Sequence, residues 1–507
     1  MSENKPDHKS LPPRTDLQAN TAAFERQSFI LPTGFREYDA RWIFGEQINL
    51  TGIHQIGVGM AELFRRRDVP LRIVVGHDYR SYSSSIKYTL ISGLLAGGME
   101  VFDIGLALSP TAYFAQFELG VEGVAMVTAS HNDNGWTGIK MGLDRPLTFG
   151  PEEMSELKEI VLAGVPEAPG GGKYHVINDM AERFIKNLTN RPTLKRKLKV
   201  VCACGNGTAG AFAPQVLKAI GCEVIELNCD LDYNFPNHNP NPEDMKMLHA
   251  MRDAVLEHKA DIALGFDGDG DRCGVVDNKG EEIFSDKVGL MLARDISNSH
   301  KNAKFVVDVK STGLFLTDPV LKENGATTDY WKTGHSYIKR YSHEHGALVG
   351  FEKSGHFFFN KPLGLGYDCG LTSGLAVLDL LDHNPDKSMN DLYNDLQTSY
   401  QSPTMSPDCA DEVKYEVSER IIAHFKQFAA DGGTLGGQPI KDVITVNGIR
   451  MVMENGSWGL IRPSSNTPQL VVVVESTQSD ENMRAIFRDI DAHLQTYEEI
   501  GAYNQKL

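Results

Sequence analysis

The sequence predicts an α/β protein with three similar α/β domains followed by a smaller α+β domain. A plan of strand, polar loop, helix, glycine and strand occurs three times, at intervals of about 130 and about 105 residues. The C-terminal segment follows a different plan, in which helices flank strands that are joined by a tight turn. A chain of 507 residues is also too long for a single hydrophobic core.

Each of the three copies begins with an apolar run and contains a second apolar run after a glycine. The predicted strand pairs are 71–76 with 100–104, 198–202 with 223–227, and 304–309 with 327–331. A helix is expected between the two strands of every pair. Such an arrangement favours parallel pairing through a helical crossover.

The C-terminal segment begins with a serine- and proline-rich stretch at 401–408, which is expected to be a linker. The elements predicted after it are a helix at 412–428, a hairpin turn at Asn447-Gly448, a strand at 470–475 and an amphipathic helix at 479–497. The predicted division of the chain is an extension at 1–27 and four domains at 28–176, 177–283, 284–398 and 399–507.

The composition argues against several classes of partner. The net charge is −17, which disfavours nucleic acid and anionic membranes, although a local basic pocket is still possible. No apolar stretch is long enough to cross a bilayer. Residues 1–27 lack the apolar core of a signal peptide and are expected to be disordered.

The seven cysteines are scattered and contain no Cys-x-x-Cys pair. Cys202 and Cys204 are separated by one residue on a predicted strand, so their side chains point to the same side. No second pair or histidine cluster accompanies them in the sequence, so reduced thiols in the cytoplasm are preferred over a metal role.

The loop at 128–132, Thr-Ala-Ser-His-Asn, follows a predicted buried strand and contains the best candidate for a nucleophile. The Ser130 hydroxyl can carry an acyl or phosphoryl group between two half-reactions. His131 and Lys140 can supply positive charge or a proton relay. A polar turn with an asparagine cap would also explain these five residues.

Three aspartates, Asp267, Asp269 and Asp271, alternate with glycines directly after another predicted buried strand. In an extended chain they point to one side, and carboxylates this close repel each other unless a cation joins them. Oxygen ligands favour a hard cation, magnesium first. An EF-hand calcium loop is excluded, because its sixth and twelfth positions must be glycine and glutamate but hold arginine and asparagine here. A plain acidic turn is the other alternative.

Two further loops carry polar side chains suited to a sugar phosphate. In the loop at 350–356, Glu352 and Ser354 can hydrogen-bond sugar hydroxyls, and His356 can exchange a proton. The loop at 459–468 combines one guanidinium, three hydroxyls and one amide, which suit a phosphate dianion. Taken alone, each loop would more often be an ordinary turn or surface loop.

The four loops, in this order and spacing, resemble the motifs of the α-D-phosphohexomutase family. That family has a T-x-S-H-N serine loop, a D-G-D-G-D-R metal loop, a G-E-x-S-G-H sugar loop and an R-x-S-x-x-x-P phosphate loop. The resemblance covers about Phe29 to Leu507. It implies three similar domains with mixed sheets between helices, and a last domain resembling the TATA-binding-protein fold. The chain is most similar to the phosphomannomutase/phosphoglucomutase branch.

The resemblance also implies roles for individual residues. Ser130 resembles the phosphoserine that gives and takes the phosphoryl group, and with Asp267, Asp269 and Asp271 it would bind magnesium. Glu352 and Ser354 would bind sugar hydroxyls, and His356 and Lys140 are the candidates for proton transfer. The residues implied in the clamp on the other phosphate are Arg462, Ser464, Ser465, Asn466 and Thr467. The remaining positions implied to face the site are Arg41, His131, Arg272, Lys310 and His335.

Arg41 lies between aromatic residues ahead of any predicted regular element, so it is interpreted as a loop residue aimed at the site. A surface salt bridge is the alternative.

The implied activity is that of an isomerase of carbohydrate metabolism. It would move a phosphoryl group reversibly between the 1- and 6-positions of mannose or glucose phosphate, through a phosphoserine and a hexose 1,6-bisphosphate. A phosphoglucosamine mutase and a sugar-phosphate phosphatase are the alternatives. The expected cofactor is Mg²⁺, and the expected partners are hexose phosphates, without nucleic acid or membrane. We expect a cytoplasmic monomer or homodimer.

Overall fold

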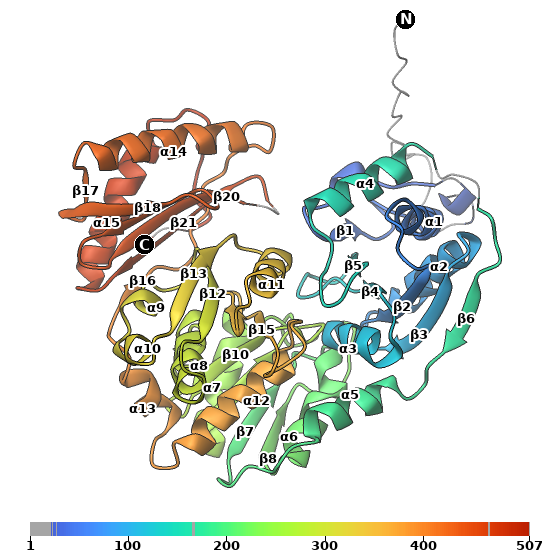
Figure 1. Cartoon of the computed structure of the whole chain (residues 1–507), viewed down its shortest axis with the longest axis horizontal. Helices are drawn as coiled ribbons and strands as arrows, with labels where there is room; N and C mark the ends of the chain where they lie inside the picture. The colour runs from blue at the N-terminus through green and yellow to red at the C-terminus, as the bar shows by residue number, and fades with distance from the viewer. Residues whose placement is uncertain (1–21, 23, 27, 165–167, 465–466, 506) are drawn as a thin grey trace, which may run out of the picture. The chain divides into compact units, whose positions relative to one another are not determined.

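The computed structural model describes residues 22, 24–26, 28–164, 168–464, 467–505 and 507 (Figure 1). These residues form four sheets in two compact units. The first unit comprises Met1–Ile283 and Leu365–Met389, and the second comprises Phe284–Gly364 and Asn390–Leu507. The predicted boundaries place Leu365–Met389 in the third domain, whereas the structure assigns this segment to the first unit.

The first sheet has the strand order β1-β5-β4-β2-β3-β6. Its strands are β1 (Ala40–Ile43), β2 (Arg72–His77), β3 (Glu100–Leu106), β4 (Gly123–Val127), β5 (Trp136–Gly142) and β6 (Lys173–Val176). The pairs of β2 with β3 and β4, and of β3 with β6, are parallel, while β5 pairs antiparallel with β1 and β4. The sheet is therefore mixed, as expected.

Helices pack against this sheet and close its core. They are α1 (Leu50–Arg66), α2 (Ser83–Ala96), α3 (Ser109–Leu119), α4 (Pro151–Leu162) and α5 (Met180–Thr189). Helices α1, α2 and α4 share one apolar core with β2, β4 and β5. Helices α1 and α2 approach closely, and glycine at position 93 makes this possible. A Cβ there would lie only 2.1 Å from the His54 carbonyl oxygen.

The start of the chain is described only in part. Phe24–Arg26 forms a short 3₁₀ helix, η1, with Phe24 buried. The Asn49 side chain donates a hydrogen bond of 3.0 Å to the Phe24 carbonyl oxygen. These three residues are therefore ordered, and most of the extension predicted at 1–27 lies outside the described residues.

The second sheet, also in the first unit, has the order β11-β10-β9-β7-β8. Its strands are β7 (Lys199–Ala203), β8 (Glu223–Leu227), β9 (Ile262–Phe266), β10 (Cys273–Asp277) and β11 (Glu282–Ile283), and its helices are η3 (Thr208–Ala211), α6 (Ala213–Ala219), α7 (Met245–His258) and α12 (Gly370–His383). Helix α7 covers the face that carries Val201 and Ala203. Helix α12 packs on the opposite face, where Gly374 meets Leu264 and Phe266.

The third sheet lies in the second unit and has the order β13-β12-β14-β15. Its strands are β12 (Lys304–Asp308), β13 (Thr327–Trp331), β14 (Val349–Phe351) and β15 (Phe357–Phe359), and its helices are α8 (Ser285–Ser299), α9 (Leu314–Thr317), α10 (Pro319–Glu323) and α11 (His335–Glu344). The single crossover helix expected here is divided in two. Pro319 has no N–H to continue the helix, and the Asp318 side chain caps the new start.

The fourth sheet, also in the second unit, is antiparallel and has the order β16-β21-β20-β19-β18-β17. Its strands are β16 (Tyr400–Gln401), β17 (Thr434–Leu435), β18 (Gln438–Ile444), β19 (Ile449–Met453), β20 (Trp458–Pro463) and β21 (Leu470–Ser476), and the helices of this region are α13 (Met389–Asn394), α14 (Lys414–Ala430) and α15 (Asp480–Leu494). The hairpin predicted at Asn447-Gly448 joins β18 to β19. Helices α14 and α15 share the core on one face.

The stretch at 401–408 is not a free linker. β16 pairs with β21, and Met405 forms a bridge with Val472. A strand edge exposes unpaired backbone groups, and this stretch supplies partners for those of β21. None of the described helices is long and apolar enough to cross a membrane.

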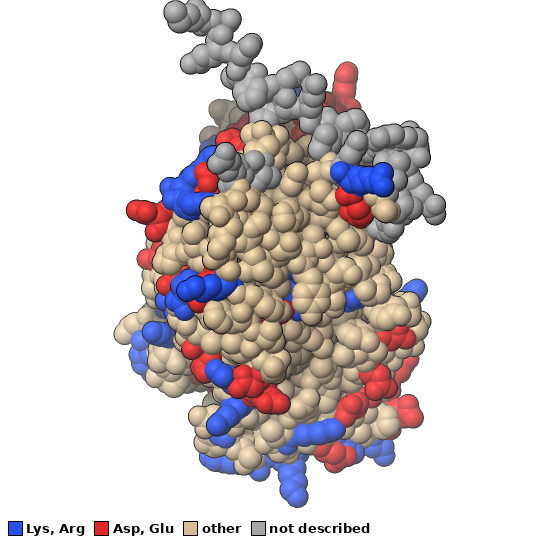
Figure 2. Space-filling model, turned by 90° about the vertical axis from the view of Figure 1, so that its right-hand side faces the viewer, with Lys and Arg blue, Asp and Glu red and all other residues tan. Residues whose placement is uncertain are grey.

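On the face shown in Figure 2, Lys and Arg side chains lie among Asp and Glu side chains over the described residues. Charges of both signs are therefore interspersed on this face of an acidic protein.

Candidate functional site

Ser130 lies on the loop that follows β4, at the carboxyl end of the strand. Its φ is 52°, so the backbone is left-handed at this non-glycine residue. Its N–H donates to Thr128 Oγ1 at 2.9 Å, and its hydroxyl lies 3.2 Å from His131 Nδ1 and 3.3 Å from Asp267 Oδ2. The loop therefore places the predicted nucleophile beside the aspartate loop of the second sheet.

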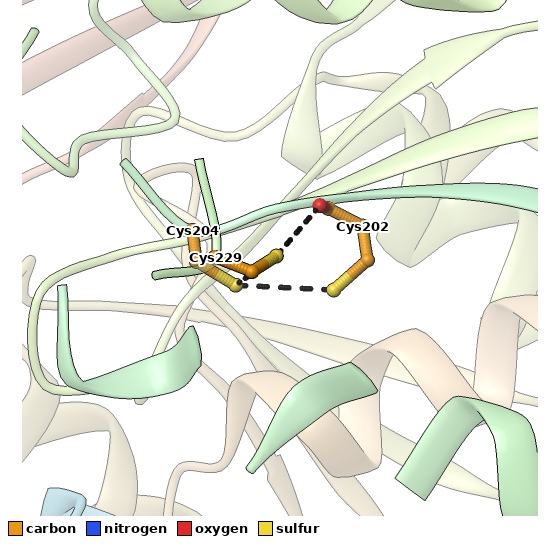
Figure 3. Close-up of side chains that lie close together, drawn as sticks. All are labelled: Cys202, Cys204 and Cys229. Atoms are coloured by element: carbon orange, nitrogen blue, oxygen red, sulfur yellow. Dashed lines mark hydrogen bonds between the residues drawn. The ribbon is translucent and has the colours of Figure 1, made fainter. Parts of the chain in front are cut away.

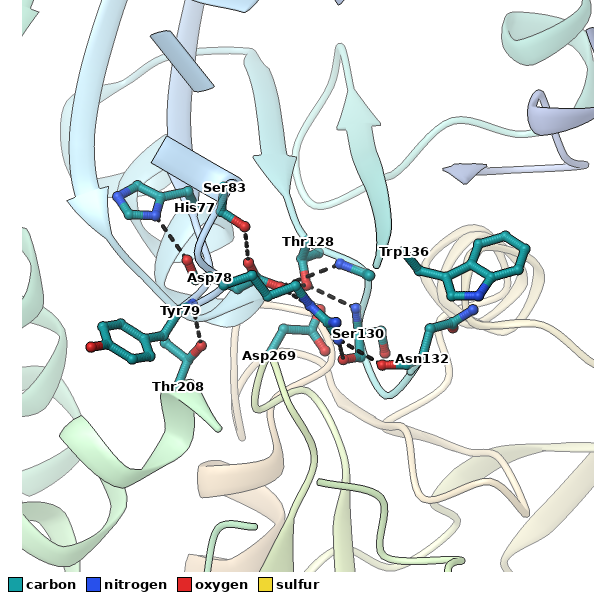
Figure 4. A network of polar contacts seen from close by, with 12 residues as sticks. His77, Asp78, Tyr79, Ser83, Thr128, Ser130, Asn132, Trp136, Thr208 and Asp269 are labelled. Carbon is teal, nitrogen blue, oxygen red and sulfur yellow. Dashed lines mark hydrogen bonds and ion pairs between the residues drawn. The ribbon is translucent and has the colours of Figure 1, made fainter. Parts of the chain in front are cut away.

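A buried polar network holds this serine loop in place (Figure 4). Asp78 accepts hydrogen bonds from Thr128 Oγ1 at 2.8 Å and from Ser83 Oγ at 2.5 Å. Arg80 donates to the carbonyl oxygens of Ser130 at 3.1 Å and Asn132 at 2.8 Å. These contacts fix the loop backbone on both sides of Ser130.

Asp78 and Arg80 were not among the predicted site residues. Both follow β2, which pairs in parallel with β4. Since the carboxyl ends of parallel strands meet at one edge of a sheet, polar residues after one strand are candidates to hold the loop after its neighbour.

Arg41 lies on β1 rather than on a loop ahead of the fold, because β1 pairs with β5. Its guanidinium donates to Asn132 Oδ1 at 2.6 Å and forms an ion pair of 2.9 Å with Asp39. The side chain thus contacts the serine loop directly.

Asp267, Asp269 and Asp271 converge in the first unit. One carboxylate oxygen from each lies within 4.8 Å of the others, and all three side chains are buried. The segment is not extended as expected. It forms a turn in which Gly270, at φ 70°, donates from its N–H to the Asp267 carbonyl oxygen at 3.1 Å. The turn, rather than strand alternation, gathers the carboxylates.

Two cations contact the three carboxylates. Lys140 Nζ forms ion pairs with Asp269, at 2.7 Å, and with Asp271. Arg272 Nε lies 3.0 Å from Asp267 Oδ2. Burial opposes the charge of Lys140, but the two aspartates outweigh it and raise the lysine pKa well above its usual value. Lys140 thus brings positive charge to the carboxylate cluster.

The carboxylates respond in opposite directions. Burial and the neighbouring Asp271 charge raise the pKa of Asp267 to about 7. For Asp269 the burial effect is outweighed by Lys140 and by a hydrogen bond from Ser109, which hold its pKa well below the usual range. Two cations thus serve three carboxylates, and Asp267 is the one whose charge is least favoured.

A cation fits this cluster. Asp269 Oδ1 is buried and has no hydrogen-bond partner among the described residues, while its other oxygen accepts from Ser109 and Lys140. An unpaired oxygen in a low-dielectric site is costly unless a positive charge approaches it. The three carboxylates can thus bind a metal ion, with the Ser130 hydroxyl 3.3 Å from Asp267.

Helix α12 supports the aspartate loop from a distant part of the chain. The Gly370 N–H donates to the Gly270 carbonyl oxygen at 3.0 Å, and a Cβ at Gly370 would lie 2.4 Å from the Arg272 carbonyl oxygen. Only glycine allows this approach. This contact was not predicted, because about a hundred residues separate α12 from the aspartate loop.

In the second unit, the loop between β14 and β15 carries Glu352, Ser354 and His356. Glu352 Oε1 accepts a hydrogen bond of 3.2 Å from the Gly334 N–H, directly before His335, and the rings of His335 and His356 lie 5.5 Å apart. Burial raises the pKa of Glu352 despite the opposing effect of His356. The structure therefore brings together these predicted sugar-site residues.

Asp308 organises the neighbouring loops of this unit and was not a predicted site residue. Its carboxylate accepts from Ser311 Oγ at 2.6 Å, Thr333 Oγ1 at 2.9 Å and the Lys353 N–H at 3.1 Å. It also lies 4.0 Å from Lys310 Nζ. It thus connects the segment of Lys310 with the loop of Glu352.

Arg462 lies near the end of β20 in the second unit, and its side chain is buried. After it, Thr467 Oγ1 donates to Ser464 Oγ at 2.8 Å, and the Ser464 N–H donates to the Gln469 carbonyl oxygen at 2.9 Å. Ser465 and Asn466, also predicted for the clamp, lie outside the described residues.

Comparison with family models covers most of the chain. The models of phosphoglucomutase/phosphomannomutase alpha/beta/alpha domains I, II and III match residues 32–166, 182–280 and 284–400, and the model of the C-terminal domain matches 412–493. The chain belongs to the phosphoglucomutase/phosphomannomutase family. It is thus a member of a family of enzymes, and the expected fold class is confirmed.

Individual relatives agree with this family assignment. The chain is 33% identical to the phosphomannomutase/phosphoglucomutase of Pseudomonas putida, over 89% of this chain and 93% of that protein. It is 34% identical to the phosphoglucomutase of Neisseria meningitidis serogroup A, over 87% of this chain and 92% of that protein.

A crystal structure from Burkholderia thailandensis, described as a phosphoglucomutase/phosphomannomutase family protein, superposes with a TM-score of 0.82. It shares 31% identity and covers 92% of this chain and 98% of its own. A putative phosphomannomutase from Thermus thermophilus shares the fold, with a TM-score of 0.74 and 21% identity over 92% of this chain and all of its own.

Proposed function

We propose that this member of the phosphoglucomutase/phosphomannomutase family interconverts the 1- and 6-phosphates of mannose and glucose through a phosphoserine at Ser130. The observation that carries the proposal is the position of the Ser130 hydroxyl, 3.3 Å from Asp267 Oδ2 in the buried aspartate cluster. A nucleophile beside a cation site suits phosphoryl transfer, in which charge must be offset and geometry held.

The first step transfers the phosphoryl group from Ser130 to the free hydroxyl of the sugar monophosphate. The P–Oγ bond breaks, a P–O bond to the sugar forms, and the hydroxyl proton passes to a base. The sugar 1,6-bisphosphate then presents its other phosphate, and the reverse chemistry returns a phosphoryl group to Ser130. Serine is thus rephosphorylated at the end of each cycle.

Asp267, Asp269 and Asp271, with phosphorylated Ser130, would hold Mg²⁺, whose preferred ligands are oxygen atoms. When bound, the ion offsets charge on the transferring group. Arg41, Arg272, His131 and Lys140 supply further positive charge around Ser130. Arg80 and Asp78 hold the loop that carries the nucleophile.

The second unit supplies recognition in this proposal. Glu352 and Ser354 bind sugar hydroxyls, with His335 and Lys310 in neighbouring positions, and His356 and Lys140 are the candidates for the proton transfer. The clamp for the phosphate that does not react consists of Arg462, Ser464, Ser465, Asn466 and Thr467.

The direct test is phosphopeptide mapping combined with coupled assays on mannose 1-phosphate, glucose 1-phosphate and glucosamine 1-phosphate. We expect phosphate on Ser130, loss of turnover in Ser130→Ala, and normal turnover in the control Ser84→Ala, which changes an exposed serine of α2. Mannose and glucose phosphates should agree in kcat/KM within about a thousandfold. An active Ser130→Ala protein would refute the proposal.

The same assays separate the alternatives. Release of free phosphate at the rate of substrate loss would identify a phosphatase, and a strong preference for glucosamine 1-phosphate would identify a phosphoglucosamine mutase. In a single turnover with labelled phosphate on Ser130 and unlabelled mannose 1-phosphate, the label should appear at carbon 6 of the product. Label that stays on the enzyme throughout would mean direct migration within the sugar.

A further inference from the structure

Three cysteines of the first unit converge on one point at the carboxyl edge of the second sheet (Figure 3). Cys202 Sγ lies 3.8 Å from Cys204 Sγ, which lies 3.5 Å from Cys229 Sγ. All three sulfur atoms are within 4.8 Å of one another, and all three residues are free, buried thiols. We propose that Cys202, Cys204 and Cys229 form a binding site for a thiophilic metal ion of the Zn²⁺ or Cu⁺ class.

The sheet topology explains why the thiols meet. Cys202 lies on β7, Cys204 follows it directly, and Cys229 comes two residues after the parallel neighbour β8. Val201 and Ala203 point into the core beneath α7, so Cys202 and Cys204 point to the opposite side. Three ligands are thus presented by two adjacent strand ends.

The backbone of the third ligand is fixed by close packing. A Cβ at Gly210, in η3, would lie 1.9 Å from the Cys229 carbonyl oxygen and 3.1 Å from its Cα. A side chain at Gly210 would push Cys229 away from the other two thiols. The cluster is therefore held by its surroundings, as a preformed ligand set requires.

The sulfur separations suit a shared ion. Ligands at a Zn–S distance of about 2.3 Å, in tetrahedral or trigonal geometry, lie roughly 3.8–4.0 Å from each other. The observed 3.8 Å and 3.5 Å need only small side-chain adjustments to reach these values. A disulfide would need about 2.05 Å, so neither pair is bonded.

The ligand chemistry separates this site from the aspartate cluster. Thiolates select soft or borderline ions, whereas carboxylates favour Mg²⁺. Binding of the ion releases the thiol protons to solvent and leaves no redox change to balance.

Occupancy should stabilise the loop that follows Cys204. This loop leads to Thr208, whose N–H donates to the Gly268 carbonyl oxygen at 3.2 Å. A metal on the thiols would therefore fix the loop that packs against the aspartate turn. We expect a structural role and no new reaction.

The test uses the full-length protein, stripped of metal under reducing conditions and titrated with Co²⁺. We expect one equivalent to produce a thiolate-to-cobalt charge-transfer band, which oxygen ligands such as the aspartates cannot give. Cys204→Ser should abolish the band. The control Cys222→Ser, which removes a buried cysteine of the same region outside the cluster, should keep it. Absence of the band, or equal loss in both variants, overturns the proposal.

A second measurement needs no variant. Alkylation of the wild-type protein, followed by peptide mass spectrometry, should show that Zn²⁺ protects Cys202, Cys204 and Cys229 at least tenfold more than the other four cysteines. This result decides the question even if Cys204→Ser fails to fold. Uniform protection, or none, would refute the site.

Discussion

Arg80 Nη2 donates a hydrogen bond of 3.1 Å to the carbonyl oxygen of Ser130, 50 residues further along the chain. The same guanidinium also holds the carbonyl oxygens of Asn132 and Asp133. A planar fork can satisfy several carbonyls at once, which a single ammonium cannot do. The left-handed turn at Ser130 is therefore maintained by a side chain from the segment that follows β2.

Replacing Arg80 should disturb this turn. We expect Arg80→Met to lower kcat about 100-fold with little change in KM, because small misplacements of a reacting group are costly. Arg80→Lys should recover only part of the loss. Arg66→Met, at an exposed arginine of α1, is the control. If kcat/KM of Arg80→Met fell only because KM rose, with kcat unchanged, Arg80 would not be what positions the turn.

The aspartate cluster predicts a metal requirement. Excess chelator should abolish activity, and Mg²⁺ should restore it. Asp269→Asn should lower kcat about 100- to 1,000-fold, since a catalytic cation contributes several kcal/mol to the transition state. Asp253→Asn, at an exposed residue of α7, should behave as wild type. Full activity in chelator contradicts the prediction.

Glu475 predicts a pH-dependent stability within the second unit. Its carboxylate is buried and accepts from Lys287 at 2.7 Å, the Gly313 N–H at 2.9 Å and Trp458 Nε1 at 2.5 Å. Burial opposes its charge, but Lys287 and the hydrogen bonds from Ser399 and Gly313 outweigh it and lower the pKa from 4.5 to about 2. The carboxylate, on β21, thus joins the fourth sheet to helix α8 and to the loop before α9 through charge-assisted contacts.

Because the folded-state pKa is depressed, this stabilisation is fully present above pH 4.5 and is lost as the pH falls toward 2. At pH 7, Glu475→Gln should lower the free energy of unfolding by about 3 kcal/mol. The difference from wild type should shrink between pH 4.5 and 2, as measured by urea denaturation. Glu481→Gln, at an exposed site in α15, is the control. A difference that does not change with pH would refute the assignment.

Replacing Gly370 with alanine should destabilise the protein, although the same change at most helical positions stabilises. Glycine to alanine at an unconstrained helical site stabilises by up to about 1 kcal/mol. Here the new Cβ would lie 2.4 Å from the Arg272 carbonyl oxygen. We expect Gly370→Ala to destabilise by about 1–3 kcal/mol and to raise the Mg²⁺ concentration needed for half-maximal activity. Thr372→Ala, in the same first turn of α12, should change neither quantity, and a more stable Gly370→Ala protein would contradict this account.

Much of the fold and site could be predicted because the signals are local. A strand that ends in a polar loop is contiguous in the sequence, so the loops of Ser130, Asp267 and Glu352 could be found from residue order alone. Helix α15 could be predicted from the spacing of four apolar residues, all of which are buried: Met483, Ile486, Ile490 and Leu494.

The parts that could not be predicted depend on distant segments. Asp78, Ser109 and Gly370 contact the site from three different elements, and no local pattern connects them to it. The aspartates were expected in an extended chain, but the glycines between them permit a turn. The alternation of aspartate and glycine fits both conformations, so it cannot distinguish them.

The return of α12 to the first unit means that neither unit is one continuous piece of chain. The polypeptide passes between the units after Ile283, after Gly364 and after Met389. A truncated chain that ends at Ile283 would lack the helix covering Leu264 and Phe266, and would expose that face of the second sheet to solvent. Synthesis of the first unit is therefore complete only when the ribosome has made about three quarters of the protein. The first unit cannot finish folding before that point.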